Sequence, residues 1–536
     1  MNEWQKEALR FREDCGRAAE LSRENLRKLM EDNRDTVYGR RYGFASIRDA
    51  GDYRRRVPIS DYSDYEDGIL RMRQGERRVL TAYEVKHYIM SSGSTGRPKR
   101  IPLTTEALTR CIPSIYYTAF ACVPGIADGR YLHMSVFRMD LSEEERDTIL
   151  SAAYFRELHD RGTFGLEERY VGGEQLMFSR EIGNVPYVKL WLALSYPELA
   201  GIQAFFLYDI LLFLRYFENH WEAVLKDVEQ RKIPADLPLS ESVKKALLQL
   251  PLPGDVWLRK VRTECGRGFE RIVERLWGQM RSVSGVGGST FSAQEPMLRF
   301  YLGRIPVHYF TYAASEGMMA VAAGMETTRN ILIPRSGFYE FLPYEKEGDG
   351  RPRGIEELEI GEYYELLVTN FSGFYRYRLN DVVKVTGFYG QAPVMEICFR
   401  KNQAVNIAGE KMDLERVAKA IELLAQRCGI RICEYSIHDD KRLLPGRYQC
   451  FLELDGREKL PGREAGKHFD RLLMELNEDY QDLRGLGLIG EPVVSQVRPG
   501  AHLECKQHFT EGPVNNKPLQ YLADPAVIRF MKERII

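Results

Sequence analysis

The feature that most constrains this chain is an apolar run that ends in a glycine- and hydroxyl-rich turn and closes on a lysine, His87-Tyr-Ile-Met-Ser-Ser-Gly-Ser-Thr-Gly-Arg-Pro-Lys99. Its glycines let the backbone approach a bulky anion, and the N–H groups of such a turn point inward as donors. The hydroxyls add donors, and Lys99 adds a positive charge suited to phosphate. The spacing differs from that of a Walker A loop. From these residues alone, a phosphate-binding loop after a strand and a flexible surface turn are about equally favoured.

Length and charge limit the classes of protein and partner. A chain of 536 residues is expected to form two or more domains. Its 76 basic and 77 acidic side chains give a net charge of -1, which argues against nucleic acid as a partner.

The nine cysteines are scattered without a CxxC pair, as in a protein of the reducing cytosol. No secretory signal is visible, and the most apolar run, Ile202 to Phe217, contains two charged residues and is predicted to be a buried helix. We therefore expect a cytoplasmic protein without a membrane partner, whose oligomeric state is left open.

Hydrophobic periodicity predicts helices in the first half of the chain and strands in the second. Residues 3–31 are predicted to form one helix, and residues 196–229 long apolar helices. Strand patterns become dense from residue 363, after earlier ones at 85–90, 281–286, 307–312 and 331–333. Beyond residue 401, helical patterns alternate with strand patterns at 433–437, 448–454 and 493–497. This alternation predicts a small α+β unit at the end of the chain.

The glycine loop carries the first resemblance to a known group of proteins. Its string Ser-Ser-Gly-Ser-Thr-Gly-x-Pro-Lys resembles the signature loop of adenylate-forming enzymes, the superfamily of acyl-CoA synthetases, firefly luciferase and peptide-synthetase adenylation domains. In that superfamily the loop grips the phosphates of ATP. The resemblance implies a catalytic role for Lys99 and ATP contacts for the loop residues Ser91, Ser92, Gly93, Ser94, Thr95 and Gly96.

A second motif follows the strand pattern at 307–310. Tyr312-Ala-Ala-Ser-Glu316 resembles the Tyr-Gly-Ser-Thr-Glu motif of adenylate-forming enzymes. The resemblance implies that Tyr312 lies against adenine, that Ser315 contacts phosphate or the acyl carboxylate, and that Glu316 is the Mg²⁺ ligand. Taken alone, a glutamate at the end of a strand is more often a solvated or capping residue.

A third motif contains an aspartate at the predicted start of a hairpin. Tyr375-Arg-Tyr-Arg-Leu-Asn-Asp381 resembles the superfamily's Tyr-Arg-Tyr-Arg-Leu-Gly-Asp, which implies that Asp381 accepts hydrogen bonds from the ribose of ATP. Asn380 replaces the usual glycine, and asparagine tolerates a positive φ, so we expect the local conformation to persist. Arg400 matches an arginine that also contacts the ribose. A turn aspartate bonded to its own backbone is the alternative for Asp381.

Further segments narrow the resemblance to one family. Nearly end to end, the chain resembles the auxin-responsive Gretchen-Hagen family of acyl acid amido synthetases, most clearly at Thr36–Phe44, Arg56–Tyr62, Tyr339–Pro343 and Arg376–Asp381. The glycine loop is closer to the general superfamily pattern than to the plant branch, which favours a bacterial-type member. The resemblance implies an α/β fold: a large N-terminal adenylation domain with mixed sheets and helices at 1–400, and a small mobile α+β C-terminal lid domain at 401–536.

The resemblance also implies a ligase reaction in two halves. A carboxylic acid attacks the α-phosphorus of ATP, with Mg²⁺ as cofactor, to give acyl-AMP and pyrophosphate; an amine, expected to be that of an amino acid, then displaces AMP. The family's catalytic lysine lies in a loop that loosely matches the one around Lys517, where a solvated surface lysine is the alternative. The small domain is expected to swing about Arg400–Asn402 between the half-reactions.

Two other functions remain open at this point. A thioester ligase that uses coenzyme A shares every ATP motif named above. A non-catalytic nucleotide-dependent binding protein is the second alternative, because Asn380 and the surroundings of Lys517 depart from the family pattern. The acid and the amine are not readable from the motifs, and the acyl pocket is expected to use residues from about 115 to 215, where prediction is weakest.

Overall fold

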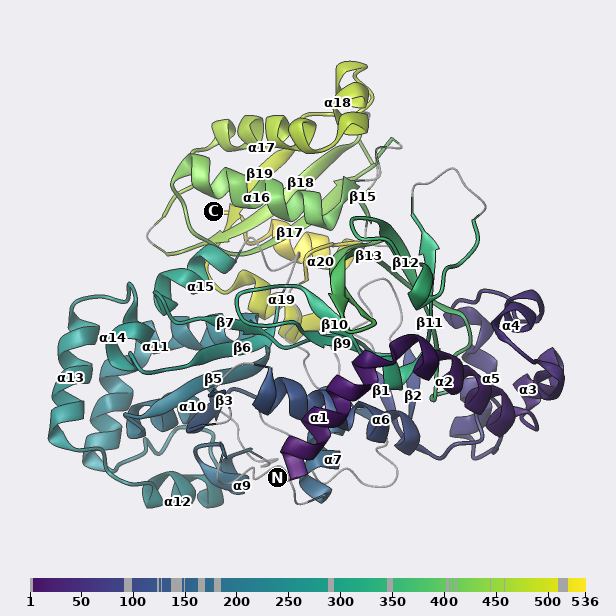
Figure 1. Ribbon diagram of the computed structural model, residues 1–536. Coiled ribbons are helices and arrows are strands. Elements are labelled where there is room, and N and C mark those ends of the chain that lie inside the picture. The colour runs from purple at the N-terminus through teal and green to yellow at the C-terminus, as the bar shows by residue number, and fades with distance from the viewer. Residues whose placement is uncertain are drawn as a thin grey trace. The chain divides into compact units, whose positions relative to one another are not determined.

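The computed structural model describes residues 3–90, 99–122, 125–126, 128–135, 147–148, 150–161, 169–177, 185–287, 294–344, 350–401, 404–405, 407–408, 410, 412–443, 445–456, 458–509 and 519–536. The chain separates into two compact units (Figure 1). Apart from the segment 92–97, the first contains the chain up to Val286 together with Arg304–Ile397; the second contains Gly287–Gly303 and Cys398–Ile536. The division into functional domains at 1–400 and 401–536 stays a prediction.

The described residues of the first unit form three sheets and most of the helices. Its described helices are α1 (Glu3–Gly16), α2 (Ala18–Asn33), α3 (Val37–Tyr42), α4 (Ala50–Arg56), α5 (Glu66–Arg73), α6 (Thr105–Tyr116), α7 (Leu150–Asp160), α9 (Gly173–Met177), α10 (Val185–Ser195), α11 (Leu207–Gln230), α12 (Glu241–Gln249), α13 (Asp255–Gly266) and α14 (Ile272–Leu276). Its described strands are β1 (Val85–Met90), β2 (Arg100–Thr104), β3 (Arg130–His133), β4 (Asp147–Thr148), β5 (Leu199–Phe206), β6 (Ser282–Val286), β7 (Val307–Tyr309), β8 (Thr311–Ala314), β9 (Gly317–Ala322), β10 (Asn330–Leu332), β11 (Gly337–Pro343), β12 (Tyr363–Asn370) and β13 (Tyr377–Tyr389), with β14 (Ala392–Arg400) at its end.

The single helix predicted for residues 3–31 is wrong, because two helices meet at Arg17. Arg17 has φ -128°, outside the helical range, and separates α1 from α2. The carbonyl oxygen of Cys15 accepts a hydrogen bond from the N–H of Gln391 at 2.7 Å instead of continuing the helix. A Cβ on Gly390 would lie 2.7 Å from the same oxygen, so only glycine allows this approach. A contact between residues far apart in sequence therefore breaks the helix.

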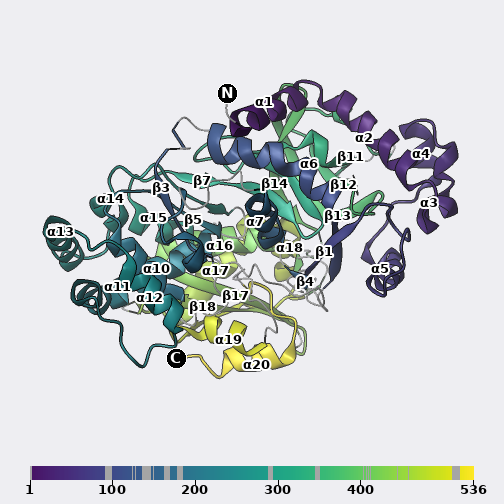
Figure 2. The same ribbon diagram turned by 90° about the horizontal axis from the view of Figure 1, so that it is seen from below.

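The helix predicted over 196–229 is also wrong in its first part. Leu199–Phe206 forms β5, and α11 begins only at Leu207. β5 lies inside the parallel sheet β3-β5-β6-β7, whose neighbouring helices include α10 and α11 (Figure 2). A strand covered on both faces is apolar without alternation, so its periodicity does not separate it from a buried helix.

The largest sheet carries two of the three predicted nucleotide motifs. Its strand order is β11-β12-β13-β14-β10-β9-β8, and the described pairs β11–β12, β12–β13, β9–β10 and β8–β9 are antiparallel. The β8–β9 hairpin carries Glu316, and β13 carries Asp381. β1, which ends where the glycine loop begins, pairs with β2 in a separate sheet.

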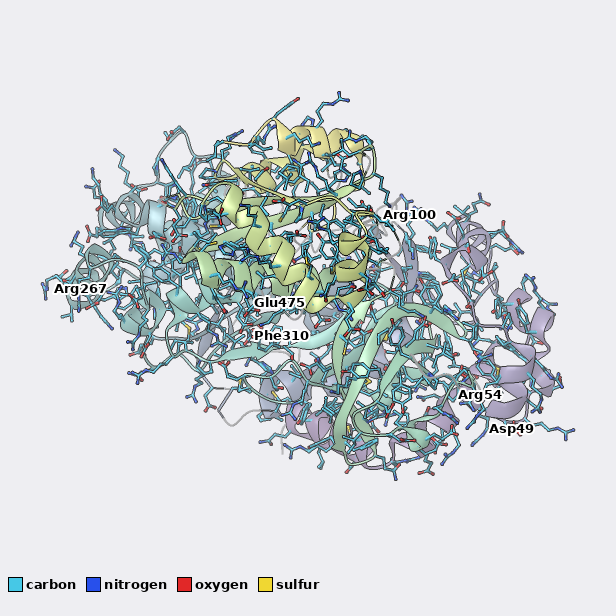
Figure 3. All side chains as sticks on the ribbon, turned by 90° about the horizontal axis from the view of Figure 1, so that it is seen from above. Asp49, Arg54, Arg100, Arg267, Phe310 and Glu475 are labelled. Atoms are coloured by element: carbon cyan, nitrogen blue, oxygen red, sulfur yellow. The ribbon has the colours of Figure 1, made fainter. Side chains whose placement is uncertain are left out.

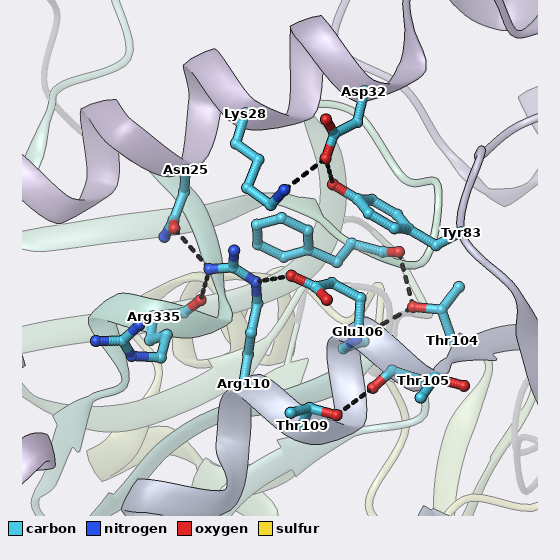
Figure 4. A network of polar contacts seen from close by, with 12 residues as sticks. Asn25, Lys28, Asp32, Tyr83, Thr104, Thr105, Glu106, Thr109, Arg110 and Arg335 are labelled. Carbon is cyan, nitrogen blue, oxygen red and sulfur yellow. Dashed lines mark hydrogen bonds and ion pairs between the residues drawn. The ribbon is translucent and has the colours of Figure 1, made fainter.

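A polar network fixes the turn after β12 to the surrounding helices (Figure 4). The guanidinium of Arg110 lies 3.7 Å from the ring centroid of Phe371 and donates to Asn25 on α2 and to Glu106. Thr104, the N-cap of α6, donates to the carbonyl of Phe371 at 2.9 Å. The segment between β12 and β13 is thus attached to α2 and α6 through Phe371.

A buried ion pair holds the start of β13. The guanidinium of Arg376 donates to Glu340 of β11 at 2.9 Å and to the carbonyl of Val57 at 2.8 Å. Arg54 of α4 also donates to Glu340 at 2.9 Å; Figure 3 labels Arg54 and Asp49, the N-cap of that helix. Glu340 is 1% exposed and Arg376 5% exposed, so these charges depend on each other for solvation.

We expect Glu340→Gln to lower the free energy of unfolding by about 3 kcal/mol, because two arginines lose their buried counter-charge. Denaturant unfolding followed by fluorescence measures this change. The matched control is Glu356→Gln, whose ion pair with Arg23 is half exposed on both sides and should contribute less than about 1 kcal/mol. Equal and small losses in the two variants would contradict the structural role of Glu340.

The second unit is a sheet covered by helices on both faces. Its described helices are α15 (Glu295–Leu302), α16 (Leu414–Cys428), α17 (Arg463–Leu476), α18 (Glu478–Gly485), α19 (Ala501–Phe509) and α20 (Pro525–Lys532), and its strands are β15 (Ala404–Val405), β16 (Met412–Asp413), β17 (Ile432–Asp440), β18 (Arg447–Leu454) and β19 (Val493–Val497). β17 and β18 are antiparallel, and β18 and β19 are parallel. One core joins the sheet to α16 and α17, and a second core joins it to α19 and α20. The predicted α+β character is confirmed, while mobility of this unit stays a prediction.

Buried polar contacts attach α19 to the sheet. Lys506 donates to Glu434 of β17 at 2.7 Å, and Glu453 accepts from the N–H of Gly500 at the start of the helix at 2.9 Å. His502 lies between Ser436 and Glu453, at 3.1 and 3.3 Å. Ser436, His502 and Glu453 are connected in the order of a hydrolase triad. None of the three is more than 3% exposed, so they attach the helix to the sheet and do not form a hydrolytic site.

The remaining general expectations concern thiols and membranes. Each of the nine cysteines is free, which agrees with the prediction that there is no disulfide framework. Within the described part of the chain, no helix is both long and apolar enough to cross a membrane.

Candidate active site

Glu316 occupies the tip of a tight hairpin. Ala314 of β8 pairs with Gly317 of β9, so Ser315 and Glu316 form the turn between them. The hydroxyl of Tyr377 donates to Oε1 of Glu316 at 2.8 Å. The backbone oxygen of Glu316 accepts from the side-chain amide of Asn370 at 2.9 Å. The predicted metal ligand is therefore fixed at both its backbone and its carboxylate.

Asp381 lies beside Tyr312, the residue of the β8–β9 motif that is predicted to lie at the adenine. The hydroxyl of Tyr312 donates to Oδ2 of Asp381 at 2.6 Å. Asp381 is 3% exposed and Tyr312 4% exposed. The structure thus brings together two residues that are far apart in sequence and that the motifs place at adenine and ribose.

The predicted hairpin start at Asp381 is corrected to a bulge within β13. Leu367 pairs with Arg378 and Glu365 pairs with Val382, so residues 379–381 of β13 face a single residue of β12. Asn380 adopts φ 62°, which confirms the prediction that asparagine takes the positive φ here. The bulge changes the direction of the Asp381 side chain relative to a regular strand.

Lys99 is linked to these motifs through Tyr62. The ammonium group of Lys99 lies 5.2 Å from the ring centroid of Tyr62, and the N–H of Arg100 donates to the Tyr62 hydroxyl at 3.1 Å. Two residues earlier, Ser60 donates its N–H to the carbonyl of Arg376 at 3.1 Å and accepts from the N–H of Arg378 at 2.9 Å. The segment 56–62 therefore connects Lys99 and Arg100 to the start of β13.

Sequence reasoning missed the side chains that hold the predicted ligands. Tyr377 stood inside a motif without an assigned role, and Asn370 stood outside every motif. The available signal for Tyr377 was its position directly before the Arg-Leu-Asn-Asp string. Asn370 offered no signal, because its contact with Glu316 spans 54 residues.

Several predicted site residues cannot be placed with the others. Ser91, Ser92, Gly93, Ser94, Thr95, Gly96 and Lys517 lie outside the described residues. Arg400 is the last residue of β14 and belongs to the second unit. Their roles stay predictions.

The donor set fits a magnesium ion held mainly by its nucleotide. Within the described residues, no three His, Cys, Asp or Glu side chains converge on one point, as a protein metal cage requires. Oε2 of Glu316 accepts no hydrogen bond from the described part of the chain, and the residue is partly exposed. Mg²⁺ is commonly bound by one or two carboxylates together with substrate phosphates.

Buried basic side chains gather at the parallel sheet β3-β5-β6-β7. His133 ends β3, and His308 lies in β7; they are 2% and 0% exposed. Burial, together with the nearby positive charges of Lys189 and Arg169, lowers the pKa of His133 to about 3. Burial and Arg169 lower the pKa of His308 to about 4. Nδ1 of His133 accepts from the N–H of Ser135 at 3.1 Å, as a neutral imidazole does.

We expect these histidines to make the protein less stable in mild acid. Their folded-state pKa values lie below the unfolded value of about 6.5, so below that pH the unfolded chain binds protons that the folded chain excludes. Each histidine then reduces the free energy of unfolding by about 1.4 kcal/mol per pH unit, until the pH reaches its folded-state pKa. Urea unfolding at several pH values from 7 to 4.5 measures the slope. His133→Asn should flatten it, and an unchanged slope would show that His133 titrates normally in the fold.

Sequence profiles of one family cover most of the chain. The GH3 family N-terminal domain matches residues 8–307, the central domain residues 330–400 and the C-terminal domain residues 415–517. The chain belongs to the GH3 family. This confirms the resemblance drawn from the motifs.

Curated GH3 relatives align over most of their own length. The chain is 26% identical to the probable indole-3-acetic acid-amido synthetase GH3.1 of Arabidopsis thaliana over 472 residues, which are 83% of this chain and 78% of the relative. It is 25% identical to the jasmonoyl-L-amino acid synthetase JAR6 of Nicotiana attenuata over 96% of this chain and 94% of the relative. Both relatives are plant proteins, so the expectation of a bacterial-type member stays a prediction.

Solved structures confirm the adenylate-forming fold. AtGH3.15 acyl acid amido synthetase, in complex with 2,4-DB, superposes with a TM-score of 0.86 at 23% identity and covers 99% of this chain and 96% of its own. A 2-hydroxyisobutyryl-CoA ligase in the postadenylation state gives a TM-score of 0.52 at 12% identity, covering 99% of this chain and 91% of its own. Amide-forming and thioester-forming ligases thus share this fold, and the fold alone does not separate them.

Proposed function

We propose that this GH3 protein is an ATP-dependent acyl acid amido synthetase that joins a carboxylic acid to an amine, expected to be that of an amino acid. The observation that carries the proposal is the pairing of Glu316 with Tyr377 and of Asp381 with Tyr312 within one unit. These contacts support the proposal, because they join residues to which the family motifs give a metal, a ribose and an adenine. The named relatives, which are amido synthetases, favour an amine as the acceptor.

Activation is required because a free carboxylate has no good leaving group. Attack of the acid on the α-phosphorus of ATP gives acyl-AMP and pyrophosphate, and negative charge grows on the phosphoryl oxygens. Lys99, Lys517 and the glycine-loop donors stabilise that charge in the proposal. Glu316 would hold Mg²⁺, which would supply further neutralisation of this charge. Asp381 and Arg400 hold the ribose, Tyr312 lies at the adenine, and Ser315 contacts the phosphate or the acid.

Acid-dependent exchange of pyrophosphate into ATP tests the first half-reaction. A library of aryl and alkyl carboxylic acids is needed, because the acid is not identified by the motifs. Exchange with at least one acid supports the proposal, and no exchange with any acid at saturating Mg²⁺ and ATP supports the alternative of a non-catalytic binding protein.

The acceptor is tested with the acid that supports exchange. The protein is incubated with ATP and that acid, and with either a mixture of amino acids or coenzyme A. Mass spectrometry of the products then distinguishes an amide from a thioester. An amide product is expected, and a thioester as the main product would assign the protein to the coenzyme A ligases.

A further inference from the structure

The contact between Tyr377 and Glu316 points to a role that the motifs leave unassigned. Tyr377 is 2% exposed, and its hydroxyl lies 2.8 Å from Oε1 of Glu316, across 61 residues of sequence. The group that accepts this hydrogen bond, Glu316, is the one carboxylate that the motifs assign to the metal.

The ring of Tyr377 has little freedom to move. Its centroid lies 4.7 Å from that of Phe374 and 6.1 Å from that of Tyr65. Ser60 pairs with the backbone on both sides of Tyr377, through Arg376 and Arg378. The Tyr377 hydroxyl is therefore fixed in position. A carboxylate that is hydrogen-bonded to it is fixed in the same way.

Glu316, in contrast, lies where a side chain is expected to be mobile. It sits in a hairpin turn, is partly exposed, and has three rotatable side-chain bonds whose freedom is lost when a ligand is bound. Asn370 fixes its backbone oxygen, and Tyr377 fixes Oε1. Within the described residues, Oε2 has no such partner and stays available as a ligand atom.

The chemistry of the donor also suits a metal ligand. An arginine or lysine would hold the carboxylate equally well but would neutralise its charge and repel a cation. A tyrosine hydroxyl is neutral, so the carboxylate keeps its full negative charge. Residues that orient a metal ligand in this way typically contribute about 10- to 100-fold in metal affinity or activity.

We propose that Tyr377 is a positioning residue for the metal: it holds Oε1 of Glu316 so that Oε2 faces the cation. The inference rests on the proposed function, because it takes Glu316 as the Mg²⁺ ligand. It predicts that loss of the hydroxyl changes the requirement for the metal, and leaves the affinity for ATP at saturating metal nearly unchanged.

The test compares Tyr377→Phe with a matched control, Tyr375→Phe. The Tyr375 side chain is fully buried two residues away, and its hydroxyl donates to the carbonyl of Leu80 at 2.8 Å without contacting Glu316. Both variants lose one buried hydroxyl and keep the ring, so their losses of thermal stability should be similar. Binding of Mn²⁺ to the full chain with a non-hydrolysable ATP analogue is measured by electron paramagnetic resonance, and the Mg²⁺ dependence of pyrophosphate exchange is measured in parallel.

We expect Tyr377→Phe to weaken Mn²⁺ binding about 10-fold and to raise the half-saturating Mg²⁺ concentration by a similar factor, whereas Tyr375→Phe changes neither. Glu316→Gln sets the loss expected when the proposed protein ligand is removed and the nucleotide phosphates remain. Wild-type metal affinity in Tyr377→Phe beside a loss in Glu316→Gln would overturn the role of Tyr377 alone. Wild-type affinity in Glu316→Gln would overturn the metal assignment itself, and the absence of exchange in the unmodified protein would overturn the proposed function.

Discussion

Glu316→Gln should reduce acid-dependent pyrophosphate exchange by about a hundredfold or more, while the protein remains folded. Glutamine keeps the shape of the side chain and an oxygen that can accept from Tyr377, but it removes the negative charge that binds the cation. The hairpin should persist, because its turn is held by strand pairing and by Asn370, which contacts the backbone oxygen. Exchange at a series of Mg²⁺ concentrations measures the effect, and circular dichroism with thermal melting checks the fold.

The matched control for this variant is Glu396→Gln. Glu396 lies on β14 of the same sheet and also accepts a hydroxyl hydrogen bond, from Thr328 at 2.7 Å. Its substitution should leave exchange within about twofold of the unmodified protein, because no motif places it at the nucleotide. Exchange by Glu316→Gln at a near-normal rate and with normal Mg²⁺ dependence would return Glu316 to the role of a solvated turn residue.

Lys517→Ala is expected to separate the two half-reactions. It should fail to form acyl-AMP from acid and ATP, because the charge growing on the α-phosphate loses a cation. The same variant, supplied with preformed acyl-AMP, should still transfer the acyl group to an amine at close to the normal rate. The reason is that, in the proposed mechanism, the second unit turns away after adenylation and the lysine no longer faces the reacting atoms.

The described residues nearest to Lys517 in sequence are attached to the second unit by contacts of their own. The described chain leaves α19 at Phe509 and resumes at Leu519, and both sides are attached to β17: Lys506 donates to Glu434, and the N–H of Ile437 donates to the carbonyl of Gln520 at 2.7 Å. Removing a side chain between these anchors should therefore leave the melting temperature unchanged. A loss of both half-reactions with a lower melting temperature would indicate a structural role, and the retention of both would indicate a solvated surface lysine.

The sequence by itself determined the local elements whose signals are complete within a few residues. The strand predicted before the glycine loop coincides with β1, Val85–Met90, and the strand predicted at 493–497 coincides with β19. Their β-branched and aromatic residues and flanking Gly or Pro residues are local signals that need no partner. The family was also readable, because motifs such as Arg376–Asp381 occupy consecutive positions.

Only the tertiary structure decided the elements whose environment comes from elsewhere in the chain. Residues 199–206 form a strand because β3 and β6 flank them, and the first helix breaks because Gly390 and Gln391 approach Cys15. The same holds for the site: Tyr377 meets Glu316 across 61 residues, and Tyr312 meets Asp381 across 69. Local patterns identify which side chains can bind a nucleotide, but strand pairing and a bulge bring them together, since contacts of this range depend on how the whole sheet is assembled.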